Sequence, residues 1–424
     1  MEASRPKHSR FRISASFWRL FASQVLSSFG EYVLEAAIVV WAVLRTGGDP
    51  SLSSFAVSAM LIATFAPRII FAPLAGHLAD RFPWTRIMQV SLAARVLCLA
   101  VLAITLPQMA TSTTDVLLAA ALIFGISAAG QFYVPARAAA AQHAIPVQAR
   151  PEAASISQFG VTGVGILATM LGPMAFTWLG MSWTILFCAI ALVLATIPLF
   201  ASGLDAPTNR GWETGVLREY AGNVAYVWRD PVLRAVLISS CIYGSALGIT
   251  NQTLPLFAFQ SLSLTPVEYG FVTASFAVGG LVGSLLSSFF VRRAGDVQAM
   301  VIALGSLGIG YAAYALVGNS LSAAIVMGVL GVLFAVYMSS QGPVLQRVVG
   351  ERKMGAVVTI MSPGLGLLTI IFTGITGLAY SWLLPYVDAR ALYMAGLFAA
   401  AAILLMVSAV IGVSLRRIAK SSPH

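Results

Sequence analysis

The feature that most constrains this chain is its series of long apolar runs. Spanning the hydrocarbon core of a bilayer takes roughly 20 apolar residues in an α-helix. Of the 424 residues, 58% are hydrophobic and only 9% are charged, whereas a typical soluble domain is about 25% charged. In water, such a chain would expose too much apolar surface. The runs therefore predict an all-α membrane protein that contacts lipid.

Twelve runs are predicted to be transmembrane helices, arranged as two pseudo-symmetric six-helix bundles. The expected spans are 17–44, 52–75, 86–106, 114–136, 156–179, 182–201, 235–260, 266–291, 298–317, 322–345, 356–384 and 391–415. The division is a tail at 1–16, bundles at 17–202 and 235–415, a linker at 203–234 and a tail at 416–424. Apolar residues at helical spacing in the linker predict a helix on the membrane surface.

The distribution of basic residues predicts the orientation. The net charge is +10, and the basic residues lie at the ends of apolar runs. This distribution argues against nucleic acid as a partner. With the amino terminus inside, the outside loops hold only Arg45 and Arg390. The cytoplasmic loops hold all the other loop bases: Arg81, Arg86, Arg137, Arg150, Arg210, Arg218, Arg229, Arg234, Arg292, Arg293, Arg347, Arg352 and Lys353. This split predicts a multi-pass protein of a cell membrane, by expectation the bacterial inner membrane, with both termini cytoplasmic.

Four charged residues lie well inside apolar runs, away from their ends. Glu31 and Glu35 are four residues apart, so one face of a helix carries both. Intramembrane carboxyls are costly and functional by default, and desolvation favours their protonated form. They suit a proton carrier or an anchor for a cationic substrate; the alternative is a carboxyl satisfied by a neighbouring helix. Arg68 and Arg95 either extend to the cytoplasmic interface, pair with an acid inside the bundle, or contact an anionic substrate.

Several polar or amphipathic side chains are candidates for lining a cavity. The alternative for each is a hydrogen bond between helices. Two of them, Asn251 and Gln252, are expected to interrupt their helix and act as a gate element. The full set is Gln24, Tyr243, Asn251, Gln252, Tyr311, Tyr314, Tyr337 and Gln341.

Other chemistries lack their motifs in the sequence. His77 and His143 are expected on separate loops without a second ligand at metal spacing, so no metal site is predicted. No Gly-x-x-x-x-Gly-Lys-Ser/Thr loop is present, which argues against ATP hydrolysis. No catalytic constellation indicates an enzyme. Cys98, Cys188 and Cys241 lie within apolar runs and are predicted to be free thiols.

Five motifs, in this order and spacing, carry a family resemblance. The chain resembles the major facilitator superfamily and, within it, the drug and siderophore exporters, which include the macrolide and enterobactin efflux permeases. The resemblance implies two bundles around a central cavity, alternating access, a small-molecule substrate, and a proton gradient as energy source without any cofactor. The motifs are Gly30-Glu31, the charged hairpin Gly76–Arg86, Pro135-Ala136-Arg137 with Ile145-Pro146, Tyr226–Arg234, and Gln346–Gly355.

The charged hairpin resembles the family's signature loop. The resemblance implies a conformational latch in which Asp80 faces the positive amino-terminal end of the helix that begins near Gly355. Gly76 would leave room for close helix approach, and Arg81 and Arg86 would bridge to cytoplasmic acids. The alternative is an ordinary solvated turn.

The helix predicted at 156–179 resembles the exporter signature through Gly165, Gly172 and Pro173. Ala168 and Ala175-Phe176 depart from that pattern, so generic membrane packing is the alternative. Together, these features predict a monomer that exports a small amphipathic organic molecule, such as a drug, siderophore or secondary metabolite, by proton coupling. The alternatives are a proton-coupled nutrient symporter, a membrane enzyme, and a receptor without flux.

Overall fold

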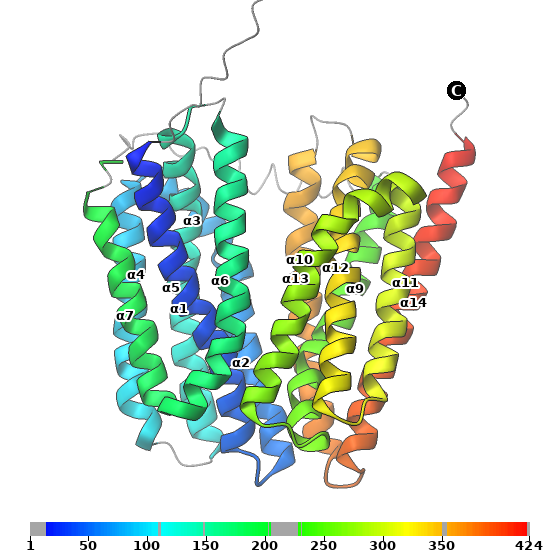
Figure 1. Cartoon of the computed structure of the whole chain (residues 1–424), viewed down its shortest axis with the longest axis horizontal. Helices are drawn as coiled ribbons and strands as arrows, with labels where there is room; N and C mark the ends of the chain where they lie inside the picture. Colours follow the sequence, from blue (N-terminus) through cyan, green and yellow to red (C-terminus); the bar gives the residue numbers. More distant parts are fainter. Residues whose placement is uncertain are drawn as a thin grey trace, which may run out of the picture.

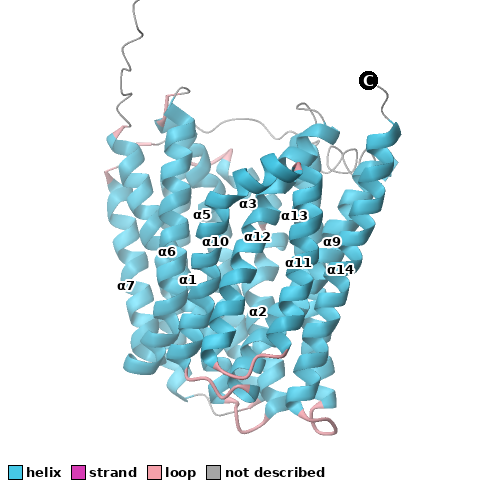
Figure 2. Ribbon diagram, turned by 45° about the vertical axis from the view of Figure 1, so that its right-hand side comes forward, coloured by secondary structure: helices cyan, strands magenta, loops and turns pink. Residues whose placement is uncertain are grey.

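The computed structural model describes residues 14–108, 112–146, 149–201, 203–204, 228–229, 231–349 and 354–421. All regular structure in these ranges is helical (Figure 2). Most of the predicted tail 1–16 and the predicted surface helix of the linker lie outside the described residues. The expectation of an all-α fold is therefore confirmed for the part of the chain that is described.

The helices form two groups that lie side by side (Figure 1). The first half contains α1 (Ala15–Arg45), α2 (Pro50–Ile70), α3 (Ala72–Ala79), α4 (Trp84–Thr105), the 3₁₀ turn Leu106–Gln108, α5 (Thr113–Ala144), α6 (Arg150–Leu179) and α7 (Met181–Phe200). The second half contains α9 (Pro231–Leu256), the π-helix Phe257–Ser261, α10 (Pro266–Ala294), α11 (Asp296–Ala315), α12 (Ser320–Val349), α13 (Met354–Leu383) and α14 (Ala389–Ser421). Eleven of these helices are long and apolar enough to cross a membrane, and α9, with 26 residues, is another long helix. The beginning of α1 and the end of α14 lie at the same end of the bundle, which we call the end with the termini (Figure 1).

Two predicted helix boundaries differ from the structure because of proline. The run 52–75 is not one helix: it divides at Phe71, and Pro73, which has no N–H to donate, lies at the start of α3. The prediction that Asn251 and Gln252 interrupt their helix was wrong, since α9 continues through Leu256. The irregular segment is instead the π-helix that follows Pro255.

Other elements extend beyond the apolar runs. Helix α5 continues to Ala144, which shortens the loop before α6, and α14 continues through Ser421 into the predicted polar tail. His77 and His143 consequently lie in α3 and α5 rather than on loops. Hydropathy marks the edge of the bilayer, whereas alanine, arginine and lysine favour continued helix in water. The sequence prediction therefore placed these ends too early.

The two halves meet along a seam between α2 of the first half and α9 and α13 of the second. Ser381 Oγ donates to the carbonyl oxygen of Ser51 at 3.0 Å. Gln252 Nε2 donates to that of Ser54 at 2.8 Å, and Ser58 Oγ lies 3.5 Å from the carbonyl oxygen of Thr373. Residues 51, 54 and 58 share one face of α2. We call these six residues the serine seam; it lies toward the end of the bundle opposite the termini.

Helix α13 crosses α2 closely because residue 377 is glycine. A Cβ atom added at Gly377 would lie 1.5 Å from Ser58 Oγ and 2.8 Å from Ser58 Cβ. Small residues at helix crossings allow this approach in membranes, where dispersion contacts supply much of the association energy. The seam therefore depends on the absence of a side chain at one position.

We expect Gly377→Val to destabilise the purified protein by about 1–3 kcal/mol, because the added atoms overpack the seam. Thermal unfolding in detergent measures the effect as a lower melting temperature. Gly163→Val is the matched control, since nothing lies within 4 Å of a Cβ at this helical glycine. Equal melting temperatures for the two variants would contradict the assignment of the seam as tightly packed.

Candidate functional site

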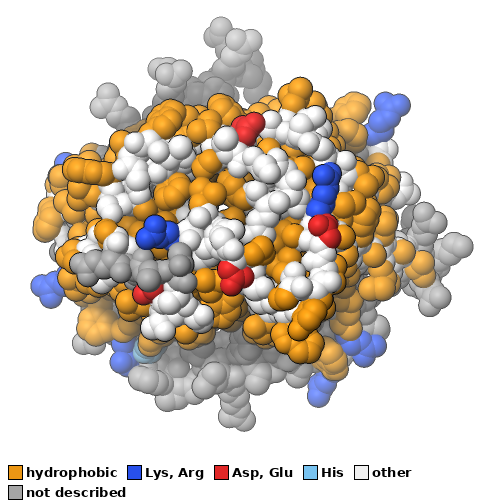
Figure 3. Space-filling view, turned by 90° about the horizontal axis from the view of Figure 1, so that it is seen from below, with side chains coloured by type: hydrophobic (Ala, Val, Ile, Leu, Met, Phe, Trp, Pro, Cys, Tyr) orange, Lys and Arg blue, Asp and Glu red, His pale blue; other side chains and the backbone are white. Residues whose placement is uncertain are grey.

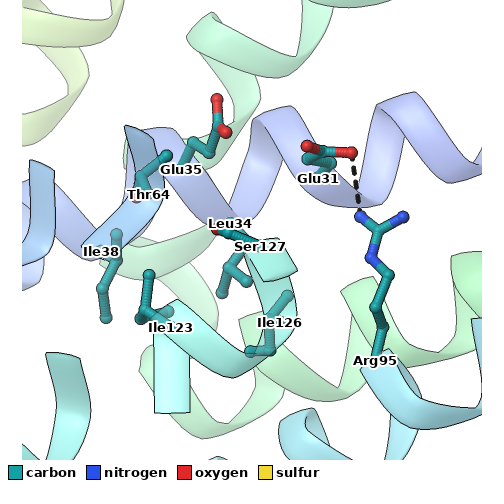
Figure 4. Close-up of a pocket in the computed structure, with 9 residues that line it drawn as sticks. All are labelled: Glu31, Leu34, Glu35, Ile38, Thr64, Arg95, Ile123, Ile126 and Ser127. Carbon is teal, nitrogen blue, oxygen red and sulfur yellow. Dashed lines mark hydrogen bonds and ion pairs between the residues drawn. The ribbon is translucent and has the colours of Figure 1, made fainter. Parts of the chain in front are cut away.

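The four intramembrane charges come together in one cluster within the first half. Figure 4 shows three of them, Glu31, Glu35 and Arg95. Arg95 Nη2 on α4 donates to Glu31 Oε2 on α1 at 3.0 Å. Arg68 Nη2 on α2 donates to Glu35 Oε1 at 2.6 Å and lies 3.8 Å from Glu31 Oε1. Both arginines are thus paired with an acid inside the bundle, which is one of the three alternatives that the sequence left open.

The two ion pairs differ in exposure. The Arg95 side chain is 2% exposed and that of Arg68 is 40% exposed, while both carboxylates are 28% exposed. Arg95 Nη1 also donates to Ser27 Oγ at 2.9 Å, and Gly130 leaves room for its guanidinium group. A buried ion whose partner is removed is strongly destabilising, whereas an exposed pair contributes little. We therefore expect the Arg95–Glu31 pair to be structural and the Arg68–Glu35 pair to be mobile.

Arg68 does not extend toward the nearest end of the bundle. It lies 18 residues into α2, or about 27 Å from the α1–α2 loop, whereas Glu35 lies 10 residues, or about 15 Å, from the same loop. The arginine therefore reaches toward the loop, into the bundle, to meet Glu35. An arginine that was only escaping the hydrocarbon would reach the other way.

A small chamber separates the two carboxylates. Its volume is about 10 Å³, which is close to the space that one water molecule needs. Glu31, Glu35, Thr64, Arg95 and Ser127 supply its polar lining, drawn from four helices (Figure 4). Such a chamber places hydroxyl and carboxyl groups around one shared point.

A larger cavity of about 490 Å³ lies between the two halves. Glu35 lines both this cavity and the small chamber. The other lining residues are mostly aromatic or aliphatic: Tyr32, Ala36, Val39, Leu61, Phe65, Thr169, Leu247, Asn251, Leu254, Pro255, Tyr269, Thr273, Phe276, Ala277, Tyr311, Met327 and Phe334. The cavity is within the size range of small-molecule sites.

Of the eight predicted cavity candidates, Asn251 and Tyr311 line this cavity. The others lie elsewhere: Gln24 accepts a hydrogen bond from Arg137 Nη1 at 2.8 Å, and Gln252 belongs to the serine seam. The rings of Tyr243 and Tyr337 lie 4.9 Å apart, and Tyr314 packs on Phe257. Gln341 is outside the lining. Most of these polar groups therefore serve packing between helices.

The charged hairpin is shorter in the structure than the motif that predicts it. Gly76 lies within α3 and Arg86 within the first turn of α4, so only Asp80–Pro83 connect the helices. Nothing lies within 4 Å of a Cβ at Gly76. Asp80 and Arg86 are exposed, while Arg81 is partly buried. The latch remains a prediction.

The glycines of α6 pack against α1. A Cβ at Gly172 would lie 2.7 Å from the carbonyl oxygen of Val33, and one at Gly165 would lie 3.6 Å from the Tyr32 ring. Pro173 is inside α6, next to the position where Gly270 of α10 approaches from the other half. This helix therefore contacts both the charged helix α1 and the second half.

Several residues of the site and the seam were not predicted as functional from the sequence: Ser27, Tyr32, Phe65 and the serines of the seam. A serine four residues before Glu31, on the same helix face, is a signal that could have identified Ser27. The serines at positions 51, 54 and 58 are three and four residues apart, which indicates a small polar face on α2. Among the described residues, no group of three or more His, Cys, Asp or Glu side chains could hold a metal ion.

Long apolar helices in two halves, with a cavity between them and a glutamate at its wall, are the architecture of a multi-pass membrane transporter. Residues 20–373 match the Major Facilitator Superfamily. The chain belongs to this family.

Relatives and solved structures agree with the family. The chain is 23% identical over 281 residues to macrolide efflux protein A of Streptococcus pyogenes, covering 65% of this chain and 66% of that protein. It is 22% identical over 339 residues to the multidrug efflux pump Tap of Mycolicibacterium fortuitum, covering 76% and 78%. The nucleoside transporter NupG superposes with a TM-score of 0.72 at 14% identity, covering 94% of this chain and 99% of that one. A bacterial Spinster homologue, solved in an inward-facing conformation, gives 0.71 at 15% identity, covering 97% and 100%.

We expect Arg95→Gln to destabilise the protein by about 3 kcal/mol or more, because Glu31 loses its buried partner. Arg68→Gln removes a partly exposed charge and should cost about 1 kcal/mol. Thermal unfolding of both purified variants in the same detergent gives the comparison. A larger loss of melting temperature for Arg68→Gln would reverse the assignment of structural and mobile pairs.

Proposed function

We propose that the protein exports a small amphipathic organic molecule by proton-coupled alternating access. The observation that carries this proposal is the place of Glu35. Its carboxylate lines the cavity between the halves and pairs with an arginine that is 40% exposed. A carboxylate at the wall of an apolar cavity can bind a proton in one state and release it in another.

The two glutamates have different roles in this proposal. Glu31 lies 3.0 Å from Arg95 and 3.8 Å from Arg68, so protonating it would leave the buried Arg95 without its counter-charge. Protonating Glu35 would release only Arg68. Glu35 therefore carries the coupling proton, and Glu31 holds the arginines in place.

The relatives support the proposed direction of transport. Macrolide efflux protein A and the multidrug efflux pump Tap are both named for efflux. The aromatic and aliphatic lining of the cavity suits the apolar body of an amphipathic molecule. These observations support export over uptake of a nutrient.

Orientation is proposed from the charges. At the end opposite the termini, the described bases are Arg45 and Arg390, and most of this face is apolar or uncharged (Figure 3). Arg81, Arg86, Arg292 and Arg293 lie toward the end that carries the termini. We propose that the end with the termini faces the cytoplasm of a bacterial cell. The serine seam then lies on the outer side, and the Asp80 latch on the inner side.

We expect Glu35→Gln to abolish proton-driven transport while the protein still folds, because an amide cannot exchange the coupling proton. A resistance screen with amphipathic compounds, in cells that express the chain, first supplies a substrate. Uptake of that compound into everted vesicles with an imposed proton gradient is the measurement. Wild-type vesicles that accumulate it show export, and a Glu35→Gln variant with the same gradient-dependent rate would contradict the role of Glu35.

We expect Asp80→Asn to slow transport severalfold without loss of expression, because the proposed latch then lacks its carboxylate. Glu152→Gln is the control, since Glu152 is an exposed acid in the first turn of α6, away from the hairpin. Both variants are measured in the same vesicles. Equal rates for Asp80→Asn and the wild type would identify the hairpin as a solvated turn.

A further inference from the structure

We propose that Arg68 occupies the place of a substrate cation, so that Glu35 and Phe65 form a binding site for an organic cation with an apolar body. This inference rests on the proposed export function and names the chemical class of its substrate. It also states what the substrate displaces. Three observations carry it: the surroundings of Arg68, a second acid within its reach, and the lining of the cavity.

The surroundings of Arg68 are those that bind organic cations. Its Nη2 is 2.6 Å from Glu35 Oε1, and its Cζ lies 5.1 Å from the centre of the Phe65 ring. A carboxylate beside an aromatic face provides both an ion pair and a cation–π contact. Glu35 and Phe65 both line the cavity, whereas Arg68 is outside its lining. A ligand cation can thus reach the same two groups from the cavity side.

Arg68 has a second partner when it leaves Glu35. Glu31 Oε1 lies only 3.8 Å from the same nitrogen atom, Arg68 Nη2. The other oxygen, Oε2, already accepts from Arg95. Arg68 can therefore move from one acid to the next along α1 without becoming an unpaired charge in the membrane.

The charges around Glu35 make the proton and the organic cation competitors. The charged groups of α1, α2 and α4 that face this place are Glu31, Arg68 and Arg95, and Tyr32 is the neighbouring titratable group on α1. With both acids ionised, the cluster is neutral. A proton or a cation on Glu35 releases Arg68 to Glu31 in either case, and both cannot occupy Glu35 at once. Exchange of one for the other is what an antiporter requires.

The cavity favours a cation over an anion. The ionised group that it presents to a ligand is the carboxylate of Glu35, and its walls contribute aromatic rings from both halves: Tyr32, Phe65, Tyr269, Phe276, Tyr311 and Phe334. The negative faces of such rings attract cations. Arg68, which could attract an anion, is not among the residues that line the cavity.

Binding of tetraphenylphosphonium to the purified full-length protein tests this proposal, and tetraphenylborate serves as an anion of nearly the same size and shape. We expect Arg68→Gln to bind the cation about fivefold more tightly than the wild type, because the competing internal cation is gone. Arg68→Lys should remain close to the wild type. Glu35→Gln should lose most of the affinity, and Phe65→Leu should weaken it severalfold. Arg137→Gln is the control. Arg137 donates a hydrogen bond to Gln24 and is not part of the charged cluster, so this variant should bind the cation with unchanged affinity.

The proposal is overturned if Arg68→Gln binds tetraphenylphosphonium as the wild type does or more weakly. It is also overturned if tetraphenylborate binds more tightly than the cation and loses affinity in Arg68→Gln, which would make Arg68 an anion site. Phe65→Leu provides a second test should Arg68→Gln unfold. If Phe65→Leu binds tetraphenylphosphonium as tightly as the wild type, Phe65 is not part of the cation site and the proposal is contradicted. Lowering the pH should weaken cation binding to the wild type but not to Glu35→Gln. Because binding needs no gradient, its failure is distinct from the failure of proton-driven transport in vesicles.

Discussion

The ion pair between Arg95 and Glu31 is the interaction on which the rest of the charged site depends. An arginine that is 2% exposed inside a membrane bundle requires a counter-charge and further hydrogen bonds. Glu31 and Ser27 provide them from successive turns of α1. This fixes the rotation of α1 against α4, and Glu35, one turn further on, is thereby held at the wall of the cavity. A rotation of α1 that moved Glu35 away would also separate Glu31 from Arg95.

Stability and exchange are divided between the two pairs by their exposure. The buried pair cannot change its charge without a large cost, so it is unsuited to a cycle in which protons come and go. The partly exposed pair of Arg68 and Glu35 contributes less to folding and can change partners at lower cost. One arginine holds the acids in position, and the other responds to what binds there. The same four residues can therefore support both a fixed architecture and a changing state.

Sequence patterns predicted the elements of this protein better than the contacts between them. Apolar length identified the membrane helices, and the spacing of Glu31 and Glu35 placed both on one face of α1. Their partners depend on how far α2 and α4 are shifted along α1, and no pattern within a single helix contains that shift. The direction of the Arg68 side chain was open for the same reason, since snorkelling and internal pairing are equally compatible with the sequence. Polar residues of the second half looked alike in sequence, but packing placed Tyr243 and Tyr337 together and left Asn251 and Tyr311 at the cavity.

Helix α2 connects the exchange site to the seam between the halves. Its first three turns carry Ser51, Ser54 and Ser58 against α9 and α13, and its last turn carries Arg68. About 15 Å of helix separates Ser58 from Arg68. Helix α2 continues through this stretch, although Pro67 removes one of its hydrogen bonds next to Arg68. In the proposed exchange of Arg68 from Glu35 to Glu31, the attachment of α2 to α1 would change at one end, while the hydrogen bonds to the second half are at the other. Helix α2 is thus a physical element whose position both the bound cation and the seam can bias, which is the requirement for coupling a binding event to the movement of two halves.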